Sequence, residues 1–334
     1  MALQRLSRGK ANMYLYDYKA VPALRVKLGE SFVIESEDAL GGAIRTPDKL
    51  PTGEVVLGFE TIPAELNPVG GPVYIEGVER GDVLVVNIEK IIVDLQGFTC
   101  WTNHSGGILG PGTFWPELEP PYSHIIKHLL GPSGTTSDGK GVLNEFQSDF
   151  RKVTWDLAPF VGTLATAPER EIESSLTGQG PYGGNMDVRD LKEGTKVYFP
   201  VYHDGGLLFS GDVHGSQGDT EFYGFADESR AEVTYSCDVI KNKTIPNPRL
   251  EKADSIITLC SYRPLEEAVR KAIFDLMDWM ITDYGMNPKE PYIHISTNPD
   301  FRINVYQMVP IGRINYTVGA EIPKKYLWYQ GASI

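Results

Sequence analysis

Short runs of alternating apolar and polar residues, interrupted by glycine and proline, constrain the fold of this 334-residue chain most. Residues 24–34 (LRVKLGESFVI) alternate in this way, and residues 73–93 repeat the pattern on both sides of the turn at 79–82 (ERGD). A period of two predicts strands that bury one face. The turn itself predicts either a hairpin or a tight loop. The 35 glycines and 23 prolines fit a fold with many turns.

Further strands are predicted in the middle of the chain. Residues 197–201, 207–210 and 231–239 are predicted to be strands, and the third (AEVTYSCDV) is strongly β-branched or alternating.

One long helix is predicted late in the chain. Apolar residues recur every three or four positions between Pro264 and Met280, and Gly285 supplies a stop. After this helix, residues 292–296 and 303–308 are predicted to be strands.

These patterns predict a mainly β fold with a late α+β portion: a sandwich-like or barrel-like core of short strands and one long helix in the C-terminal region. We expect a β-rich lobe at 1–150, a central β lobe at 151–245 that carries the site motifs, and an α+β lobe at 246–334. One compact unit is the alternative.

The net charge of −13 narrows the class of partner, because an acidic surface repels nucleic-acid phosphates and anionic lipids. No apolar stretch approaches the length of a membrane span, and we expect no signal peptide. Cys100, Cys237 and Cys260 are widely spaced, which excludes a CxxC metal site and argues against a disulfide framework. We therefore expect a cytoplasmic protein with no nucleic-acid or membrane partner.

The densest group of polar residues lies in two segments, 183–187 (GGNMD) and 211–221 (GDVHGSQGDTE). Asp212 and His214 are two residues apart, so on a strand both side chains share one face. Asp187 could reach the same point from a neighbouring strand. Carboxylates with one imidazole favour a divalent metal, zinc first, or calcium if oxygen ligands dominate. The alternative is a solvated acidic turn.

Other residues carry weaker signals. His124 and His128 have the spacing of a helical pair, but no HExxH glutamate accompanies them. His104 could line a pocket from a loop. The sequence contains no G-x-S-x-G elbow, phosphate-binding loop or dinucleotide fingerprint, which argues against an α/β-hydrolase and against nucleotide-binding enzymes.

Several ordered stretches carry a family resemblance. They are residues 67–88, 159–168 (PFVGTLATAP), 183–201, 207–224, and the closing block from 291 (PYIHISTNPDFRINVYQMV). On these motifs the chain resembles the acetamidase/formamidase family, hydrolases of short aliphatic amides. The resemblance implies a β-rich fold, cleavage of the carbon–nitrogen bond of a small linear amide to carboxylate and ammonia, and a homo-oligomer.

The metal group and the resemblance together give a mechanism hypothesis. A metal on Asp187, Asp212 and His214 would activate water for attack on the amide carbonyl. Glu221 would act as general base and then as general acid.

The same hypothesis assigns supporting roles. Asn185 and Gln217 would donate hydrogen bonds to the developing oxyanion. Asp219 would orient His214 or serve as a further metal ligand.

Four aromatic residues stand where the family pattern has others: Tyr182, Phe222, Tyr223 and Phe225. We expect them to restrict the pocket to one- or two-carbon amides, and the alternative is that they stack on a larger planar substrate.

Two other classes of function remain open at this point. One is a non-catalytic small-ligand or metal-binding member of the same fold. The other is a covalent amidase with Cys100 or Cys237 as nucleophile, although neither has a basic neighbour in sequence that would activate a thiolate.

Overall fold

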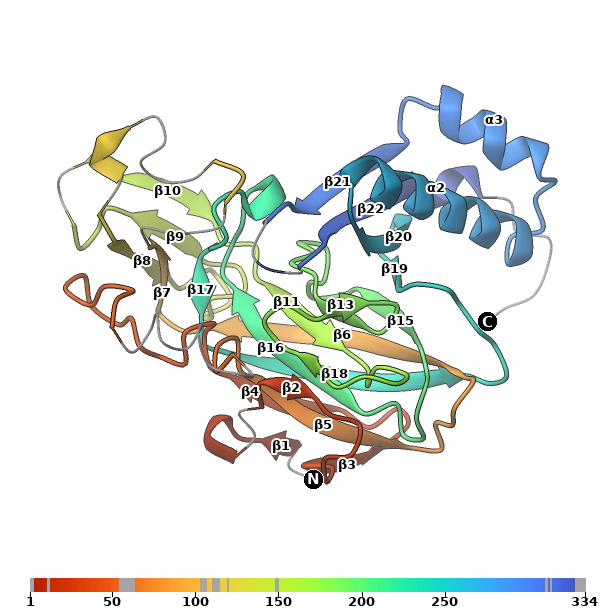
Figure 1. Ribbon diagram of the computed structural model, residues 1–334, viewed down its shortest axis with the longest axis horizontal. Coiled ribbons are helices and arrows are strands. Elements are labelled where there is room, and N and C mark those ends of the chain that lie inside the picture. Colours follow the sequence, from red (N-terminus) through yellow and green to blue (C-terminus); the bar gives the residue numbers. More distant parts are fainter. Residues whose placement is uncertain are drawn as a thin grey trace.

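The computed structural model describes residues 3–10, 13–53, 64–102, 107–109, 115–118, 120–147, 150–309, 312 and 314–327. Within these residues the strands form sheets of nine, eleven and two strands, which confirms the mainly β fold (Figure 1). Both large sheets are open, with distinct first and last strands, so the arrangement is sandwich-like and the barrel-like alternative is wrong.

The nine-stranded sheet is antiparallel except where its first two strands pair. It contains strands from each of the three predicted lobes, before residue 150, between 150 and 245, and after 245. The division into lobes stays a prediction. Its strands, in order across the sheet, are β1 (Gln4–Leu6), β4 (Phe32–Ser36), β18 (Ala231–Ile240), β6 (Val83–Val93), β15 (Lys196–Pro200), β19 (Arg249–Glu251), β20 (Ser255–Tyr262), β22 (Tyr316–Pro323) and β21 (Arg302–Gln307).

The eleven-stranded sheet carries the polar motifs near its middle. Its main path is β10 (Val153–Asp156), β9 (Lys140–Leu143), β8 (Tyr122–Leu129), β7 (Gln96–Trp101), β17 (Glu228–Ser229), β16 (Leu208–His214), β11 (Phe160–Ala165), β14 (Gly183–Asn185) and β13 (Gln179–Gly180). A branch adds β5 (Val69–Glu76) beside β16 and β3 (Leu24–Lys27) beside β5. The small sheet pairs β2 (Leu15–Tyr16) with β12 (Glu173–Ser174).

The described residues also form the short 3₁₀ helices η1 (Arg8–Lys10), η2 (Pro116–Leu118) and η3 (Asp219–Glu221) between strands, and η4 (Lys324–Tyr326) after β22.

The predicted strands of the central segment are confirmed as β15, β16 and β18. The alternating run at 24–34 forms two strands, β3 and β4, that belong to different sheets. The turn at 79–82 likewise joins β5 and β6 of different sheets, so it is a tight loop and not a hairpin. The buried Asp82 side chain closes that loop by accepting a hydrogen bond of 2.8 Å from the Glu79 backbone N–H.

The main apolar core holds side chains from the inner faces of both large sheets. Ile34, Val86 and Phe199 of the nine-stranded sheet and Leu164 and Val213 of the eleven-stranded sheet belong to this one buried cluster. Each such side chain contributes roughly 1.5–3 kcal/mol when it leaves water. The core therefore fixes the two sheets face to face and holds β11 and β16 firmly in place.

The long predicted helix is confirmed as α2 (Leu265–Thr282), which begins directly after Pro264. It packs on β20 and β22 through a second apolar cluster, and Figure 1 shows it across that edge of the sheet. Ala268, Ala272 and Leu276 are buried at the four-residue spacing that the sequence displays.

The strand predicted at 292–296 is wrong, because this segment lies in the helix α3 (Lys289–Thr297). Pro291 and Ile295, four residues apart, are buried, whereas Tyr292 and Ile293 are 71% and 61% exposed. A single buried stripe of that spacing stabilises a helix even though the residues themselves favour strands. The strand predicted next, at 303–308, is confirmed as β21.

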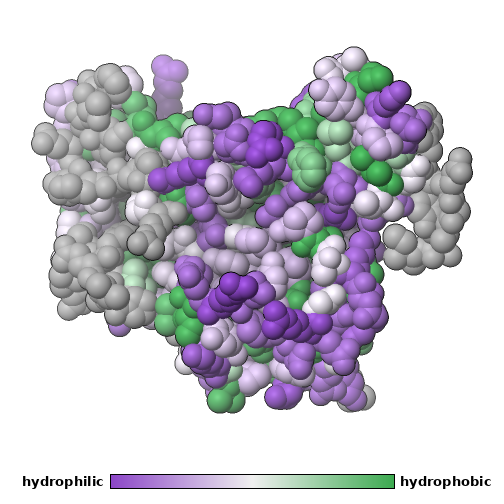
Figure 2. All heavy atoms as spheres, turned by 45° about the vertical axis from the view of Figure 1, so that its right-hand side comes forward, coloured by the Kyte–Doolittle hydropathy of each residue, from purple (hydrophilic) through white to green (hydrophobic). Residues whose placement is uncertain are grey.

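The visible surface is mixed in polarity. Figure 2 shows hydrophilic residues over much of this face, with hydrophobic residues in small groups between them. Among the described residues, no helix combines the length and apolarity needed to cross a bilayer.

The packing of α2 predicts a large difference between its two faces. Leu276→Ala should lower the free energy of unfolding by about 2–5 kcal/mol, because Leu276 is fully buried and the neighbours cannot fill the space. Phe274→Ala, on the exposed face of the same helix, should change it by less than about 0.5 kcal/mol. Urea denaturation of both variants measures this. Equal effects would contradict the packing described.

Candidate active site

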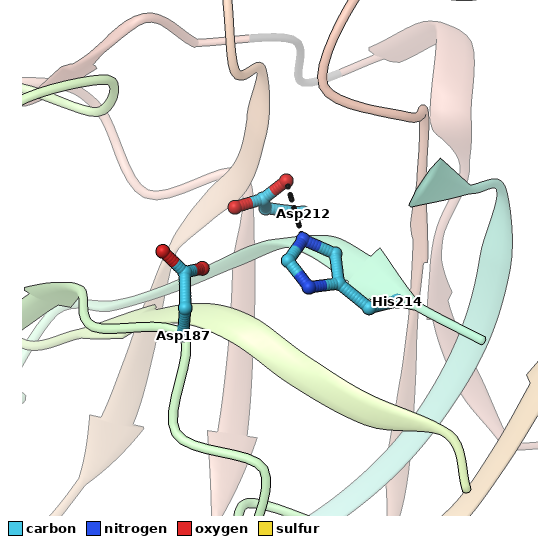
Figure 3. A group of neighbouring side chains, drawn as sticks. All are labelled: Asp187, Asp212 and His214. Atoms are coloured by element: carbon cyan, nitrogen blue, oxygen red, sulfur yellow. Dashed lines mark hydrogen bonds and ion pairs between the residues drawn. The ribbon is translucent and has the colours of Figure 1, made fainter. Parts of the chain in front are cut away.

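The predicted site residues converge around one glycine. Strand β11 pairs with β14 on one side and β16 on the other, so Asp187, just after β14, and Asp212, on β16, lie on either side of it. Their carboxylates meet over Gly162, where a Cβ atom would lie 2.8 Å from Asp187 Oδ1 and 3.0 Å from Asp212 Oδ2. Figure 3 shows the two carboxylates and the imidazole of His214 directed toward one another. Only glycine at position 162 leaves room for this approach.

The backbone at these carboxylates is unusual. Asp187, Asp212 and Glu221 have φ values of 49°, 54° and 45°, in the left-handed region. Non-glycine residues rarely adopt it, and each such residue costs of order 1–3 kcal/mol unless its surroundings hold it. Here the surroundings include the Asp187 backbone N–H, which donates to the Gly162 carbonyl at 3.0 Å. Strain of this kind concentrates at functional sites.

The orientation of His214 is set by Gln217. The Gln217 side-chain nitrogen lies 3.2 Å from the Asp187 carbonyl and 3.1 Å from the Tyr306 carbonyl. Carbonyls only accept, so this nitrogen donates both hydrogens and Gln217 Oε1 must accept from His214 Nδ1, 2.9 Å away. The proton of His214 therefore sits on Nδ1, and Nε2 faces the carboxylates.

Two carboxylates flank that nitrogen. Asp212 Oδ1 and Glu228 Oε2 each lie 3.3 Å from His214 Nε2. The arrangement suits either a second proton on the imidazole or a metal ion between these atoms.

The pKa values of the group reflect the burial of several carboxyl groups close together. Burial, and then the neighbouring Asp212 carboxylate, raise the pKa of Asp187 to about 7. Burial raises the pKa of Glu221 well above its ordinary value and also raises that of Glu228. Burial alone would lower the pKa of His214, but Glu228 and Asp212 raise it well above its ordinary value.

The donor set fits a divalent cation. Ligand atoms of Asp187, Asp212 and His214 lie within 4.8 Å of one another, and so do those of His214, Glu221 and Glu228. Asp187 Oδ1 is buried without a hydrogen-bond partner among the described residues. Buried carboxylates are stable when they are paired, protonated or bound to metal. One imidazole with carboxylates is a ligand set that zinc accepts.

A small cavity opens beside this group. It has a volume of about 50 Å³, and Asn185, Asp187, Asp212 and Glu221 line it together with apolar side chains. Four of the predicted site residues therefore line the same cavity. The Asn185 amide nitrogen donates to the Leu176 carbonyl at 2.9 Å, which leaves its second N–H as a donor.

Two predicted residues are placed differently from what we expected. Both Gln217 hydrogens point to backbone carbonyls, so this amide holds His214 in place and has no hydrogen left for an oxyanion. Asp219 does not reach the group. Its side chain is 64% exposed and pairs with Arg189 at 2.5 Å, so solvent and a cation already satisfy it.

Sequence reasoning missed Gly162, Glu228 and Gln307. Glu228 faces the site because β17 pairs with β16, with Glu228 opposite His214. Gln307 comes from β21 and donates a hydrogen bond from Nε2 to Asp187 Oδ2. Glu228 depends on the pairing of β17 with β16, and Gln307 on the approach of β21 to η3. The only sequence signal was that Gly162 and Gln307 lie within stretches that carry the family resemblance.

Of the four aromatic residues, only Phe225 lines the cavity. Tyr182 is buried in a separate apolar cluster, with its ring centroid 5.8 Å from that of Tyr16. Phe222 and Tyr223 line an adjacent groove of about 420 Å³, which Phe225 also borders. A restriction of the cavity by aromatic side chains therefore rests on Phe225.

The remaining candidates have other partners. His124 and His128 lie on strand β8 and not on a helix. His128 Nε2 pairs with Asp227 at 3.0 Å, and His124 Nε2 accepts from the Asn144 N–H at 3.1 Å. His104 lies outside the described residues.

The cysteine alternative is not supported. Cys100 and Cys237 are both fully buried, and burial raises the pKa of each thiol far above its ordinary value. A thiol in such surroundings stays protonated and is a poor nucleophile.

Comparison with known proteins finds similarity over most of the chain. The acetamidase/formamidase family model matches residues 11–181 and 176–325. The crystal structure of an acetamidase from Yersinia enterocolitica has a TM-score of 0.81 and 32% identity, covering 97% of this chain and 92% of that one.

Curated relatives are similar over a shorter span. The formamidase of Methylophilus methylotrophus is 28% identical over 59% of this chain and 56% of its own length. The acetamidase of Mycolicibacterium smegmatis is 26% identical over 60% of this chain and 58% of its own length. The chain thus spans less than two thirds of the length of these relatives.

The pKa shifts predict an unusual pH dependence. After removal of metal, the free energy of unfolding should fall as the pH rises from about 4 to about 7, between the ordinary and the folded pKa of Asp187. Folded Asp187, with a pKa of about 7 against an ordinary 3.8, holds its proton more tightly than the unfolded chain does. The raised pKa values of His214, Glu221 and Glu228 act in the same direction. Urea denaturation with a chelator measures it. Asp187→Asn should weaken the trend, and stability rising with pH would contradict it.

The ligand set predicts which substitutions release metal. Asp212→Asn and His214→Ala should each weaken zinc binding by at least about 100-fold, because each removes a buried ligand atom. Asn tolerates the left-handed backbone at position 212, so the fold should persist. Asp219→Asn, at an exposed position on the same segment, is the matched control. Calorimetric titration with zinc distinguishes them, and tight binding by Asp212→Asn would place the ligands elsewhere.

Proposed function

Because this chain belongs to the acetamidase/formamidase family, we propose that it hydrolyses the carbon–nitrogen bond of small linear amides such as formamide or acetamide, giving a carboxylate and ammonia. The observation that carries the proposal is the cavity of about 50 Å³ with the carboxylates of Asp187, Asp212 and Glu221 in its wall. A cavity this small suits a formyl or acetyl group, and its apolar side is made by residues such as Leu40, Leu66 and Phe225.

Asp187, Asp212 and His214 would hold a divalent metal, with zinc favoured because an imidazole nitrogen joins the carboxylates. Calcium would require more oxygen ligands. Such a cation would supply Lewis acidity, which makes water more acidic and polarises a carbonyl. Asp187 Oδ1, which has no hydrogen-bond partner among the described residues, supports this assignment.

Glu221 is the proposed proton carrier. It lines the cavity, and its raised pKa brings proton uptake closer to neutral pH than for an exposed glutamate. Its carboxylate would take a proton from the attacking water while the water oxygen bonds to the amide carbon. The same proton would then pass to the nitrogen as the carbon–nitrogen bond breaks, so that ammonia leaves neutral.

Asn185 and His214 would assist this reaction in different ways. The free N–H of Asn185 would donate to the carbonyl oxygen as negative charge develops on it. His214, fixed by Gln217, would keep Nε2 directed at Asp212 and Glu228. Gln217 is a positioning residue in this scheme.

The proposal extends to the setting of the enzyme. We propose a cytoplasmic location, which the three free, buried cysteines support, and a homo-oligomer, which the family resemblance supports. The net charge of −13 supports a small-molecule substrate over a nucleic-acid partner.

Glu221→Gln tests the proposal directly. The variant should bind zinc as tightly as the wild type but release ammonia from formamide about 10²–10⁴-fold more slowly, because the amide keeps the shape and cannot carry the proton. Zinc titration and an ammonia assay at pH 7 measure the two effects.

The controls separate the proposal from its alternatives. Wild-type protein treated with a chelator should lose activity and regain it with zinc. A wild type that releases no ammonia from formamide or acetamide while it binds zinc would favour the non-catalytic reading. Loss of zinc from Glu221→Gln would make Glu221 a ligand.

A further inference from the structure

Asn67 lies at the wall of the same cavity although it is remote in sequence from the other site residues. It is separated by Pro68 from the start of β5, which pairs with β16, with Val69 opposite Gly211. A Cβ at Gly211 would lie only 2.5 Å from the Pro68 carbonyl oxygen, so the missing side chain lets this segment pass close to the strand that carries Asp212. Asn67 is 1% exposed and lines the cavity with Asp212 and Glu221.

The contacts of the Asn67 side-chain amide identify which of its two terminal atoms is the nitrogen and which is the oxygen. Asn67 Nδ2 lies 2.9 Å from the Ser175 carbonyl and 3.1 Å from Thr163 Oγ1. Because the carbonyl can only accept, the nitrogen is assigned correctly and the other end of the amide is the oxygen. Asn67 Oδ1 is buried and accepts no hydrogen bond from any described residue.

A buried acceptor without a donor is unfavourable, so its presence in a residue that lines the cavity points to a ligand that supplies a hydrogen. The residues around Asn67 indicate where such a ligand would lie. Thr163 Oγ1 connects Asn67 to the site, since it lies 3.2 Å from Asp212 Oδ2. A group in the cavity beside Asn67 Oδ1 can satisfy this oxygen by donating a hydrogen bond from N–H or O–H.

Resting on the proposed function, we propose that Asn67 Oδ1 accepts a hydrogen bond from the amide N–H of the substrate. This contact holds the nitrogen end of the amide while Asn185 holds the oxygen end. It makes Asn67 a specificity residue that selects amides over esters of the same size, because an ester has no hydrogen at that position. The carboxylate product has none either, so the contact is lost when ammonia leaves.

Asn67→Gly is the appropriate variant. Asn67 has a φ of 57°, which glycine adopts without strain, so the substitution removes the side chain and keeps the backbone. Asn144→Gly is a matched control: Asn144 has a φ of 61°, is buried, and also has an Oδ1 without a partner among the described residues. It lies at the end of β9 and is not among the residues that line the cavity.

The experiment compares kcat/KM for acetamide and for methyl acetate in wild type and both variants, all loaded with zinc. Asn67→Gly should lower the acetamide-to-ester ratio by about 10–100-fold, the usual effect of leaving one buried hydrogen bond unmade. Asn144→Gly should leave the ratio unchanged. Zinc affinity should be the same in all three proteins.

An unchanged ratio in Asn67→Gly would overturn the inference, and loss of zinc would do so too, by making Asn67 Oδ1 a metal ligand. If Asn67→Gly does not fold, the acetamide-to-ester ratio of Asn67→Asp tests the inference instead. A carboxylate there is still an acceptor, so the ratio should be retained, and its loss would overturn the inference.

The amide-hydrolysis proposal can be wrong while the Asn67 contact is right, and a binding experiment distinguishes the two. If wild type cleaves neither compound, that function is wrong, and equilibrium binding of acetamide against methyl acetate, followed by NMR titration, tests the contact alone. Asn67→Gly should then lower the preference for acetamide by the same 10–100-fold. Equal binding preference in wild type and variant would overturn the inference.

Discussion

The burial of four carboxyl groups around one imidazole, with room made by Gly162, is the constraint on which the rest of the molecule depends. Asp187, Asp212, Glu221 and Glu228 lie inside a sandwich whose sheets are held by apolar side chains. Because these carboxylates are buried away from water, each needs a proton or a nearby cation to be stable. The raised pKa values are one consequence and the fit to a divalent metal is another, so the same burial that stabilises the sheets prepares the site.

Local patterns in the sequence predicted the elements well and their partners poorly. The strand patterns identified β15, β16 and β18, and the three-to-four spacing identified α2, which buries one face against the sheet. The segment at 292–296 was misjudged because its residues favour strands while its burial follows a helix. Strands β5 and β6 are adjacent in the chain yet belong to different sheets, which no local pattern encodes.

The same distinction explains the site. Asp212 and His214 could be grouped because they share one strand, and Asp187 and Glu221 because they flank it in dense polar motifs. Glu228 and Gln307 reach the group only through pairing of β17 with β16 and through the approach of β21. Spacing also could not show that the hydrogens of an amide are already used, which is why an oxyanion role suggested itself for Gln217 but does not fit the structure.

Neutral amides surround the carboxylates where charged side chains could have stood. Gln307 donates to Asp187, Gln217 to the carbonyl of the same residue, and Asn67 to Thr163, which contacts Asp212. Each fixes a geometry without neutralising a charge. A lysine or arginine in place of Gln307 would hold Asp187 ionised by direct pairing and lower its pKa. It would also compete with a cation for that carboxylate. The amides thus leave the negative charge of the group available to a divalent ion. They also leave the proton affinity of Glu221 high, as its proposed role toward the leaving nitrogen requires.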